Sequence, residues 1–231
     1  MKILITGASQ GLGEAIATQL AQKGHSLILI ARNKEKLERI SEKLSLNTTV
    51  KIIAADLSLT SSIKNIAESF TKEDSPDVLI NNLGIFRPGK ASNLKIEEIK
   101  AQLELNLYVA VQLTNELLPH FKAKGKGQVF NIGSVASHSA ISTSAAYSIS
   151  KHALKAWNDS LREEVREDGI KVTSIFPSSI NTSSWKGVKG VDTSKMIQKE
   201  DIAQLIATMI ELGDATLIEE VRLSPLQNFF L

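Results

Sequence analysis

The chain of 231 residues contains no cysteine, only 5% aromatic residues and no long apolar run. Without cysteine it can form no disulfide bond, no thiolate nucleophile and no cysteine-based metal site. A transmembrane helix needs about 18 or more consecutive apolar residues, which are absent. The apolar start at residues 1–6 is too short for a signal peptide. We therefore expect a cytoplasmic protein that does not associate with membranes.

The chain also lacks a strong charge of either sign. It has 27 basic and 25 acidic residues, a net charge of +2, and no basic run that would indicate nucleic-acid binding. The four histidines do not show the spacing of metal ligands, and we predict no bound metal. Apolar residues make up 42% of the chain, which is typical of a globular protein with a sizeable core.

Short apolar runs alternate with segments of helical periodicity along the whole chain. The apolar runs predict buried strands, and the segments between them predict helices. Expected strands lie at residues 2–6, 27–31, 50–55, 77–80, 128–132, 170–176 and 217–223. Expected helices lie at residues 12–23, 33–44, 58–70, 95–121, 145–168 and 200–212. This alternation predicts one α/β domain over residues 1–231, a Rossmann-type doubly wound parallel sheet with helices on both faces.

Three glycines gather in the turn after the first expected strand, which reads Thr6-Gly7-Ala-Ser-Gln-Gly11-Leu-Gly13. Glycine allows a tight turn and a close approach of the backbone to a ligand. The N-terminus of the helix that follows favours a phosphate. The spacing differs from the common dinucleotide fingerprint, and the Gly-Lys-Ser/Thr of a P-loop is absent. We predict a phosphate-binding turn, and a P-loop NTPase is disfavoured.

Tyr147 and Lys151 lie four residues apart in an expected helix. This spacing places both side chains on one face, about one turn apart. A nearby ammonium lowers the pKa of a phenol from its usual value of about 10. The pair could therefore exchange a proton near neutral pH. The same spacing also occurs on exposed amphipathic helices, so the pair alone does not identify an active site.

Five motifs in one order resemble those of the short-chain dehydrogenase/reductase family. They are the glycine-rich turn at 6–13, the segment Asn81-Asn82-Leu83-Gly84, Asn106, Ser134, and the Tyr147–Lys151 pair. The resemblance covers nearly the whole chain. It implies reversible hydride transfer between a nicotinamide cofactor and the carbonyl or alcohol carbon of a small-molecule substrate.

The resemblance also implies a role for each of the four candidate catalytic residues. Tyr147 would exchange a proton with the reacting oxygen. Lys151 would lower the pKa of Tyr147 and bind the hydroxyls of the nicotinamide ribose. Ser134 would orient the reacting oxygen, and Asn106 would hold a water in a proton relay behind Lys151.

The choice of cofactor depends on the end of the second expected strand, which reads Ala31-Arg32-Asn33. An acidic residue there would bind the ribose 2′-hydroxyl of NAD, whereas an Arg accommodates the 2′-phosphate of NADP. We therefore predict NADP(H) rather than NAD(H), with Ser9 assisting Arg32. The alternative is that Arg32 is a solvated charge beside Asn33, which can cap the next helix.

The resemblance implies further cofactor contacts on several elements. They involve Gly7, Ser9, Gln10, Gly11, Leu12, Gly13, Asp56, Leu57, Asn82, Gly84, Tyr147, Lys151, Pro177, Ile180 and Thr182. Asp56 would contact the adenine, although it could equally cap the helix that begins near Ser58. We expect Asn82 mainly to tie the central strand to its neighbours.

The sequence departs from the family pattern in two places and extends it with a short lid. Leu83 replaces the usual Ala, and Ser178 replaces the usual Gly after Pro177. Residues 183–198 are expected to form the lid, in which Trp185 either covers a substrate or anchors the loop. The apolar end at residues 229–231 (Phe229, Phe230 and Leu231) is expected to contact another subunit.

Three functions are compatible with these features. We favour an NADP-dependent reductase of small ketones or diketones, with a reductase of 3-oxoacyl chains on acyl carrier protein as an alternative. A catalytically silent dinucleotide sensor or scaffold is the third. A serine hydrolase is disfavoured, because Ile132 and Ala136 occupy the positions where its nucleophile elbow needs glycine. By resemblance, the helices at 95–121 and around Tyr147 should pair in a homodimer or homotetramer.

Overall fold

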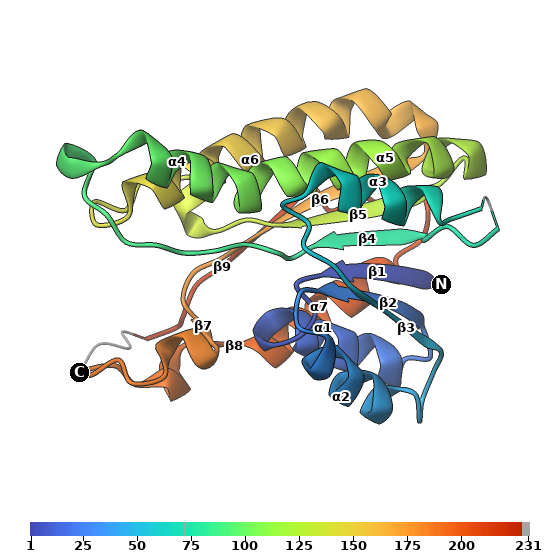
Figure 1. Ribbon diagram of the computed structural model, residues 1–231, viewed down its shortest axis with the longest axis horizontal. Coiled ribbons are helices and arrows are strands. Elements are labelled where there is room, and N and C mark those ends of the chain that lie inside the picture. Colours follow the sequence, from blue (N-terminus) through green and yellow to red (C-terminus); the bar gives the residue numbers. More distant parts are fainter. Residues whose placement is uncertain (72, 228–231) are drawn as a thin grey trace.

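A seven-stranded parallel sheet forms the centre of the computed structural model, which describes residues 1–71 and 73–227 (Figure 1). The order of the strands is β3-β2-β1-β4-β5-β6-β9. Their bounds are β1 Lys2–Thr6, β2 Ser26–Ala31, β3 Val50–Ala54, β4 Val78–Asn81, β5 Gly127–Ile132, β6 Ile170–Pro177 and β9 Glu220–Leu223. A separate short pair is formed by β7 (Ile180–Asn181) and β8 (Ile197–Gln198). The predicted doubly wound α/β fold is confirmed.

Helices cover both faces of the sheet (Figure 1). The α-helices are α1 Gly11–Gln22, α2 Lys34–Leu44, α3 Thr60–Glu68, α4 Ile96–Leu103, α5 Val109–Lys124, α6 Ala145–Val165 and α7 Lys199–Ile210. Short 3-10 turns are η1 Ala91–Asn93, η3 Val135–Ser137, η4 Arg166–Asp168, η5 Ser183–Trp185 and η6 Thr193–Lys195, and a π-helical turn, η2, spans Glu104–Tyr108. Helices α1, α2 and α7 lie on one face, and α3, α5 and α6 on the other (Figure 1).

The two faces bury separate apolar layers because side chains alternate along each strand. In β1, Ile3 and Ile5 pack into the layer under α1 and α7, whereas Leu4 packs into the layer under α3 and α5. All three side chains are fully buried. This explains the continuous apolar runs in the sequence, which are typical of parallel strands covered on both sides.

The expected elements occur with a few changes of boundary. The helix expected over 95–121 is interrupted by the π-helical turn, and the one around Tyr147 ends at Val165. The last strand begins at Glu220 rather than at residue 217. The carbonyl of Ile218 accepts a hydrogen bond from the Thr173 hydroxyl at 2.7 Å, so a side chain takes the place of the backbone ladder there.

No helix in residues 1–71 and 73–227 is long and apolar enough to cross a membrane. The predicted apolar contact at Phe229, Phe230 and Leu231 lies outside the described residues.

The carboxyl ends of the parallel strands meet at one edge of the sheet, on the left in Figure 1. The strand order reverses direction between β1 and β4. In open α/β sheets, ligands bind at such a switch point, outside the carboxyl ends of the strands. The fold therefore indicates where a ligand site should lie.

Candidate active site

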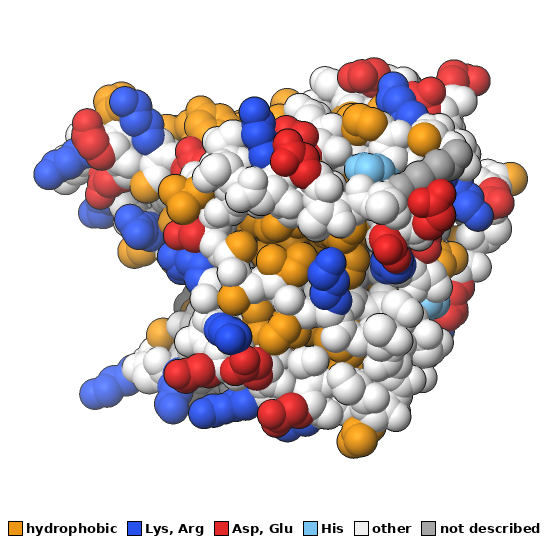
Figure 2. Space-filling view, turned by 45° about the vertical axis from the view of Figure 1, so that its right-hand side comes forward, with side chains coloured by type: hydrophobic (Ala, Val, Ile, Leu, Met, Phe, Trp, Pro, Cys, Tyr) orange, Lys and Arg blue, Asp and Glu red, His pale blue; other side chains and the backbone are white. Residues whose placement is uncertain are grey.

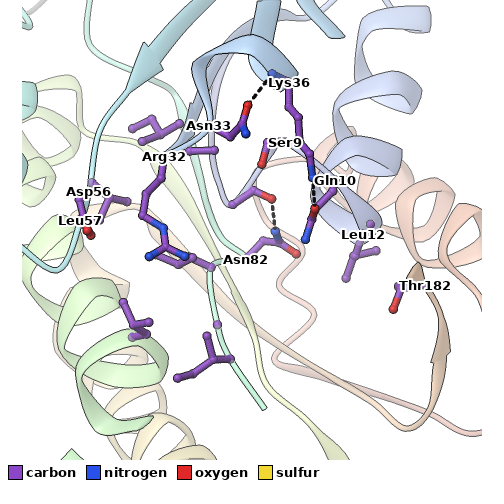
Figure 3. A pocket seen from close by; sticks show the side chains of 18 of the residues that line it. Ser9, Gln10, Leu12, Arg32, Asn33, Lys36, Asp56, Leu57, Asn82 and Thr182 are labelled. Atoms are coloured by element: carbon purple, nitrogen blue, oxygen red, sulfur yellow. Dashed lines mark hydrogen bonds between the residues drawn. The ribbon is translucent and has the colours of Figure 1, made fainter. Parts of the chain in front are cut away.

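A cavity of about 710 Å³ opens at the switch point between β1 and β4 (Figure 3). Most of the predicted cofactor contacts line it, from five separate parts of the chain. They are Gly7, Ser9, Gln10, Gly11, Leu12, Arg32, Asp56, Leu57, Asn82, Gly84 and Thr182. Gly13, Tyr147, Lys151, Pro177 and Ile180 are absent from its lining.

The glycine-rich turn is held in a shape that only glycine adopts readily. Gly7 and Gly11 have φ angles of 65° and 62°, in the left-handed region. The Asn82 amide donates hydrogen bonds to the carbonyls of Thr6 at 2.9 Å and Gly7 at 3.2 Å, which fixes the turn against β4. A Cβ atom on Gly13 would lie 2.4 Å from the Gly7 carbonyl oxygen. Gly13 therefore allows α1 to pack closely on the turn, beneath the cavity.

Two cations line the β2 end of the cavity, where Arg32 points toward Asn82 and Lys36 toward Gln10 (Figure 3). Arg32 follows β2, and Lys36 lies in the first turn of α2, where its Nζ donates to the Gln10 side chain at 2.7 Å. The side chain of Asn33 accepts a hydrogen bond from the Lys36 amide at 2.8 Å and caps α2, as predicted. The sequence analysis missed Lys36. Lys36 could have been noticed because a cation in the first turn of a helix is disfavoured by the helix dipole, which suggests that it is kept for a ligand.

Asp56 lines the same end of the cavity, but its carboxylate is hydrogen-bonded to a residue two positions further along the chain. Its carboxylate accepts hydrogen bonds from the amide and hydroxyl of Ser58 at 3.0 and 2.8 Å. These bonds, helped by the charge of Arg32, lower the pKa of Asp56. Asp56 therefore makes a turn with Ser58, whereas α3 begins only at Thr60.

Lys151 lies behind the cavity with its side chain almost completely buried. Its ammonium donates a hydrogen bond to the carbonyl of Ile132, at the end of β5, at 2.8 Å. Burial lowers the pKa of Lys151 to about 8, because the charged form loses solvation. A Cβ atom on Gly84 would lie 2.9 Å from the amide oxygen of Asn106, so glycine at this position lets the cavity wall pack closely on Asn106, and Lys151 Nζ lies next to it.

Tyr147 lies one helical turn before Lys151 and is half-buried. Burial raises the pKa of Tyr147, and a hydrogen bond with the Ser134 side chain lowers it by a smaller amount. This differs from the expectation that Lys151 lowers the pKa, because Lys151 Nζ lies 5.9 Å from the centre of the Tyr147 ring and bonds to Ile132 instead. The protein groups therefore keep the phenol protonated at neutral pH.

Ser134 follows β5 and faces Tyr147. It is 7% exposed and caps η3, with its hydroxyl oxygen accepting a hydrogen bond from the Ala136 amide at 3.1 Å. The preceding Gly133 is packed closely, since a Cβ atom there would lie 2.6 Å from the Phe176 ring. The end of β5 thus places the Ser134 hydroxyl beside the phenol.

Asn106 lies in the π-helical turn η2 and is buried. Its amide oxygen accepts from the Ile85 amide at 2.7 Å, and its nitrogen donates to the Ile85 carbonyl at 3.0 Å and to the Ser150 hydroxyl at 2.9 Å. Asn106 therefore connects the loop after β4 to the helix that carries Lys151. π-Helical turns occur frequently at functional sites.

The structure brings Asn106, Ser134, Tyr147 and Lys151 to one place from η2, β5 and α6. Phe86 packs the edge of its ring against Tyr147, with ring centres 5.1 Å apart, and was not predicted as a site residue. Among residues 1–71 and 73–227, no group of His, Asp and Glu side chains could hold a metal ion.

The loop after β6 supplies the remaining predicted contacts. Pro177 ends β6, and Ile180 pairs with Ile197 in the β7–β8 pair. Thr182 lines the cavity together with Ser183 and Ser184, which the sequence analysis did not select. The side chains of Thr182 and Ser184 share a hydrogen bond of 2.6 Å.

Comparisons with known proteins are consistent with this geometry. A family model described as short chain dehydrogenase matches residues 1–192. An uncharacterized oxidoreductase of Staphylococcus epidermidis is 28% identical over 223 residues, which make up 96% of each chain.

Two solved structures are similar over almost their whole length. An alcohol dehydrogenase from the archaeon Thermococcus sibiricus, complexed with 5-hydroxy-NADP, is 25% identical with a TM-score of 0.89, covering 97% of this chain and 96% of that one. A metagenomic short-chain oxidoreductase in complex with NADP is 28% identical with a TM-score of 0.84, covering 99% of this chain and 98% of that one.

Proposed function

The chain belongs to the short chain dehydrogenase family of oxidoreductases, and we propose that it uses NADPH to reduce the carbonyl group of a small-molecule substrate. The observation that carries this proposal is the convergence of Ser134, Tyr147, Lys151 and Asn106 beside the cavity at the switch point. Ser134 bonds to Tyr147, Lys151 lies one helical turn after Tyr147, and Asn106 connects the loop after β4 to their helix.

The cavity fits a nicotinamide dinucleotide. The left-handed glycines let backbone amides approach a pyrophosphate at the start of α1. At the β2 end, Arg32 and Lys36 offer two cations to a ribose 2′-phosphate, and Arg32 stands directly after β2, where an acidic residue would bind the 2′-hydroxyl of NAD. The bound NADP compounds in the two similar solved structures also support this choice. When bound, the dinucleotide supplies the hydride.

Burial raises the pKa of Tyr147, so the phenol is in the protonated form that carbonyl reduction requires. A protonated phenol can donate its proton to the carbonyl oxygen as negative charge develops there. The Ser134 hydroxyl donates a hydrogen bond to the same oxygen and orients it. We assign Lys151 to the hydroxyls of the nicotinamide ribose rather than to the phenolate, because its ammonium bonds to the Ile132 carbonyl and lies 5.9 Å from the centre of the Tyr147 ring.

We propose further that the chain works as one dinucleotide-binding domain, with residues 183–198 as a lid over the substrate. Ser183 and Ser184, the first residues of this segment, line the cavity together with the preceding Thr182, which supports the position of the lid. We infer that Asn106 holds a water of a proton relay through its amide oxygen, because both N–H groups of the amide already donate, to the Ile85 carbonyl and to the Ser150 hydroxyl.

The direct test is oxidation of NADPH and NADH by the purified protein against a panel of carbonyl compounds. The panel holds an aromatic diketone, a quinone, a ketosugar and a neutral 3-oxoacyl thioester. We expect turnover with NADPH on at least one class. Tyr147→Phe should lower kcat by a factor of about 100 to 10,000, because it removes the proton donor.

The chain has two tyrosines, so Tyr108→Phe is a matched control. Tyr108 is 42% exposed, and this variant should keep full activity. Equal activity of Tyr147→Phe and the unchanged protein would contradict the mechanism. Tight NADPH binding without turnover of any compound would support a dinucleotide sensor instead.

A further inference from the structure

Two exposed segments of purely basic charge continue from the walls of the cavity. Residues 86–96 contain Arg87, Lys90 and Lys95 and no acidic residue, and residues 183–191 contain Lys186 and Lys189 and no acidic residue. All five side chains are exposed. Because the net charge of the whole chain is only +2, the rest of the chain is net negative. The two segments carry three and two basic residues, and the acidic residues Glu97, Glu98 and Asp192 follow directly after them.

Both segments lie beyond the carboxyl ends of the strands, where the cavity opens. The first begins directly after Gly84 and Ile85, and the second begins with Ser183 and Ser184, all of which line the cavity. They project from the same edge of the sheet, at the upper and lower left in Figure 1. Figure 2 shows basic side chains, with acidic ones beside them, on both sides of the hollow between these arms.

The first segment is held firmly against the catalytic residues. Ile85 is bound by Asn106, and the buried amide of Gln102 bonds to the backbone of Arg87 at 3.4 and 3.2 Å. Gly89 exchanges backbone hydrogen bonds with Thr143 at 2.7 Å and with Ala145 at 2.9 Å, at the start of α6. Arg87 and Lys90 thus flank a backbone that is fixed two residues from Tyr147.

These cations have neither protein partners nor a place in the proposed cofactor site. In the part of the chain that the structure describes, Arg87, Lys90, Lys186 and Lys189 form no ion pair. The 2′-phosphate end of the cavity is at Arg32 and Lys36, after β2, whereas these segments follow β4 and β7. Like charges gathered without partners repel one another, and a bound anion relieves that repulsion.

We propose that the carbonyl substrate carries a phosphate-bearing group on the side away from the reacting carbon, and that Arg87, Lys90, Lys186 and Lys189 bind this group at the mouth of the cavity. The proposal rests on the proposed function, because it names the substrate class of the same site. Four cations on two sides fit several negative charges on an extended group, such as the phosphates of a coenzyme A thioester.

The test compares two substrates with the same acyl group. A 3-oxoacyl thioester of coenzyme A carries phosphates, and the corresponding thioester of N-acetylcysteamine is neutral but otherwise presents the same reacting carbonyl. With NADPH saturating, we expect kcat/KM to be at least tenfold higher for the coenzyme A thioester at low salt. This preference should fall as salt screens the exposed charges, whose range is about 10 Å at 0.1 M.

The variants should act on one substrate only. Replacing all four cations by Gln should lower kcat/KM for the coenzyme A thioester by about tenfold, through KM, because rim charges act on encounter and binding. The neutral thioester and the KM for NADPH should be unchanged. Lys126→Gln is the matched control, since Lys126 is exposed directly before β5, at the opposite edge of the sheet.

The outcomes separate the two proposals. Turnover of both thioesters without a charge preference, or with an equal loss for both in the fourfold variant, would overturn the assignment of the basic segments and leave the reductase in place. If neither is reduced, the reductase fails for this substrate class. Calorimetric binding of the coenzyme A thioester then decides the present proposal, since the fourfold variant must weaken it about tenfold for the assignment to stand.

The same phosphate-bearing arm can also be presented by an acidic carrier protein. The 3-oxoacyl chain on acyl carrier protein is therefore the third substrate. A kcat/KM above that of the coenzyme A thioester, lowered by the fourfold variant, would identify the carrier as the source of the negative charge. A value below it would identify the small thioester.

Discussion

Lys151 carries a positive charge in a place that disfavours it. Its side chain is 5% exposed, and burial lowers its pKa from 10.5 to about 8. The unfolded chain therefore binds this proton up to about pH 10.5, while the folded chain holds it only up to about pH 8. Between these values the unfolded state binds more protons, so the free energy of unfolding rises with pH. Below pH 8 the full cost of the buried charge remains.

Lys151→Met should consequently stabilise the fold while it removes activity. At pH 7 we expect the free energy of unfolding to rise by about 2 kcal/mol. The lowered pKa accounts for about 3 kcal/mol, and the unpartnered Ile132 carbonyl offsets about 1 kcal/mol. Urea unfolding at pH 7 and pH 10 measures this, and the difference from the unchanged protein should shrink toward pH 10. A variant that is less stable at pH 7 would show that the charge is well solvated in the fold.

Arg32 and Lys36 should each contribute to the affinity for NADPH. Each Ala substitution should raise the KM for NADPH about tenfold, because a charge-assisted hydrogen bond to the 2′-phosphate is lost. The KM for NADH, which lacks that phosphate, should hardly change. Arg39→Ala is the control, because Arg39 is exposed on the same helix. An unaltered NADPH affinity in Arg32→Ala would mean that Arg32 is only a solvated charge.

The sequence could predict those residues whose partners lie within one motif. Tyr147 and Lys151 share a helix, and Gly7 and Gly11 share a turn, so spacing alone relates them. Gln102 could not be found in this way, because its partner Arg87 is fifteen positions away and its role depends on how α4 packs. The raised pKa of Tyr147 also had no signal in the sequence, since burial and the bond between Lys151 and Ile132 appear only in the fold.

For whole helices too, the sequence predicted the extent of the element but not its internal geometry. Apolar periodicity predicted one helix over residues 95–121, and helical structure indeed runs through this range. It did not reveal the π-helical turn at Glu104–Tyr108, because such a turn changes the hydrogen-bond partner without breaking the helix. That turn carries Asn106, so the departure from regular geometry coincides with a predicted catalytic residue.

Helix α6 is fastened to the sheet by a buried chain of amides. Asn131 on β5 donates to Asn158 on α6 at 2.6 Å and accepts from Asn81 on β4 at 2.8 Å, and Asn81 also donates to Thr114 on α5 at 3.0 Å. Asn158 lies two turns after Lys151, on the same face of the helix. This chain therefore holds the catalytic helix in register with β5.

Asn158→Ala should test that attachment. It leaves the Asn131 amide without its acceptor in the core, so we expect the free energy of unfolding to fall by about 2 kcal/mol. Ser160→Ala on the exposed side of α6 is the control and should change it by less than about 0.5 kcal/mol. Denaturant unfolding of the three proteins gives both values. Equal stability of the two variants would mean that α6 is held by its apolar contacts alone.

At the scale of the whole molecule, the surface carries apolar side chains that a monomer would leave in water. Tyr108 in η2 and Ile149 on α6 are 42% and 43% exposed. Tyr108 lies directly before α5, and Ile149 lies on α6. The resemblance predicts that subunits pair through these two helices. Exposed apolar groups that gather on one face of a molecule mark interaction surfaces.

We therefore expect light scattering to give a homodimer or a homotetramer at micromolar concentration. The double substitution Tyr108→Glu and Ile149→Glu should reduce the assembly to smaller units, because it would bury like charges against each other in an interface formed by two copies of one surface. Leu46→Glu is the matched control, since Leu46 is 87% exposed in the loop after α2, away from α5 and α6. A monomeric mass for the unchanged protein would contradict the assembly, whereas an unchanged oligomer in the double variant would place the interface on another face.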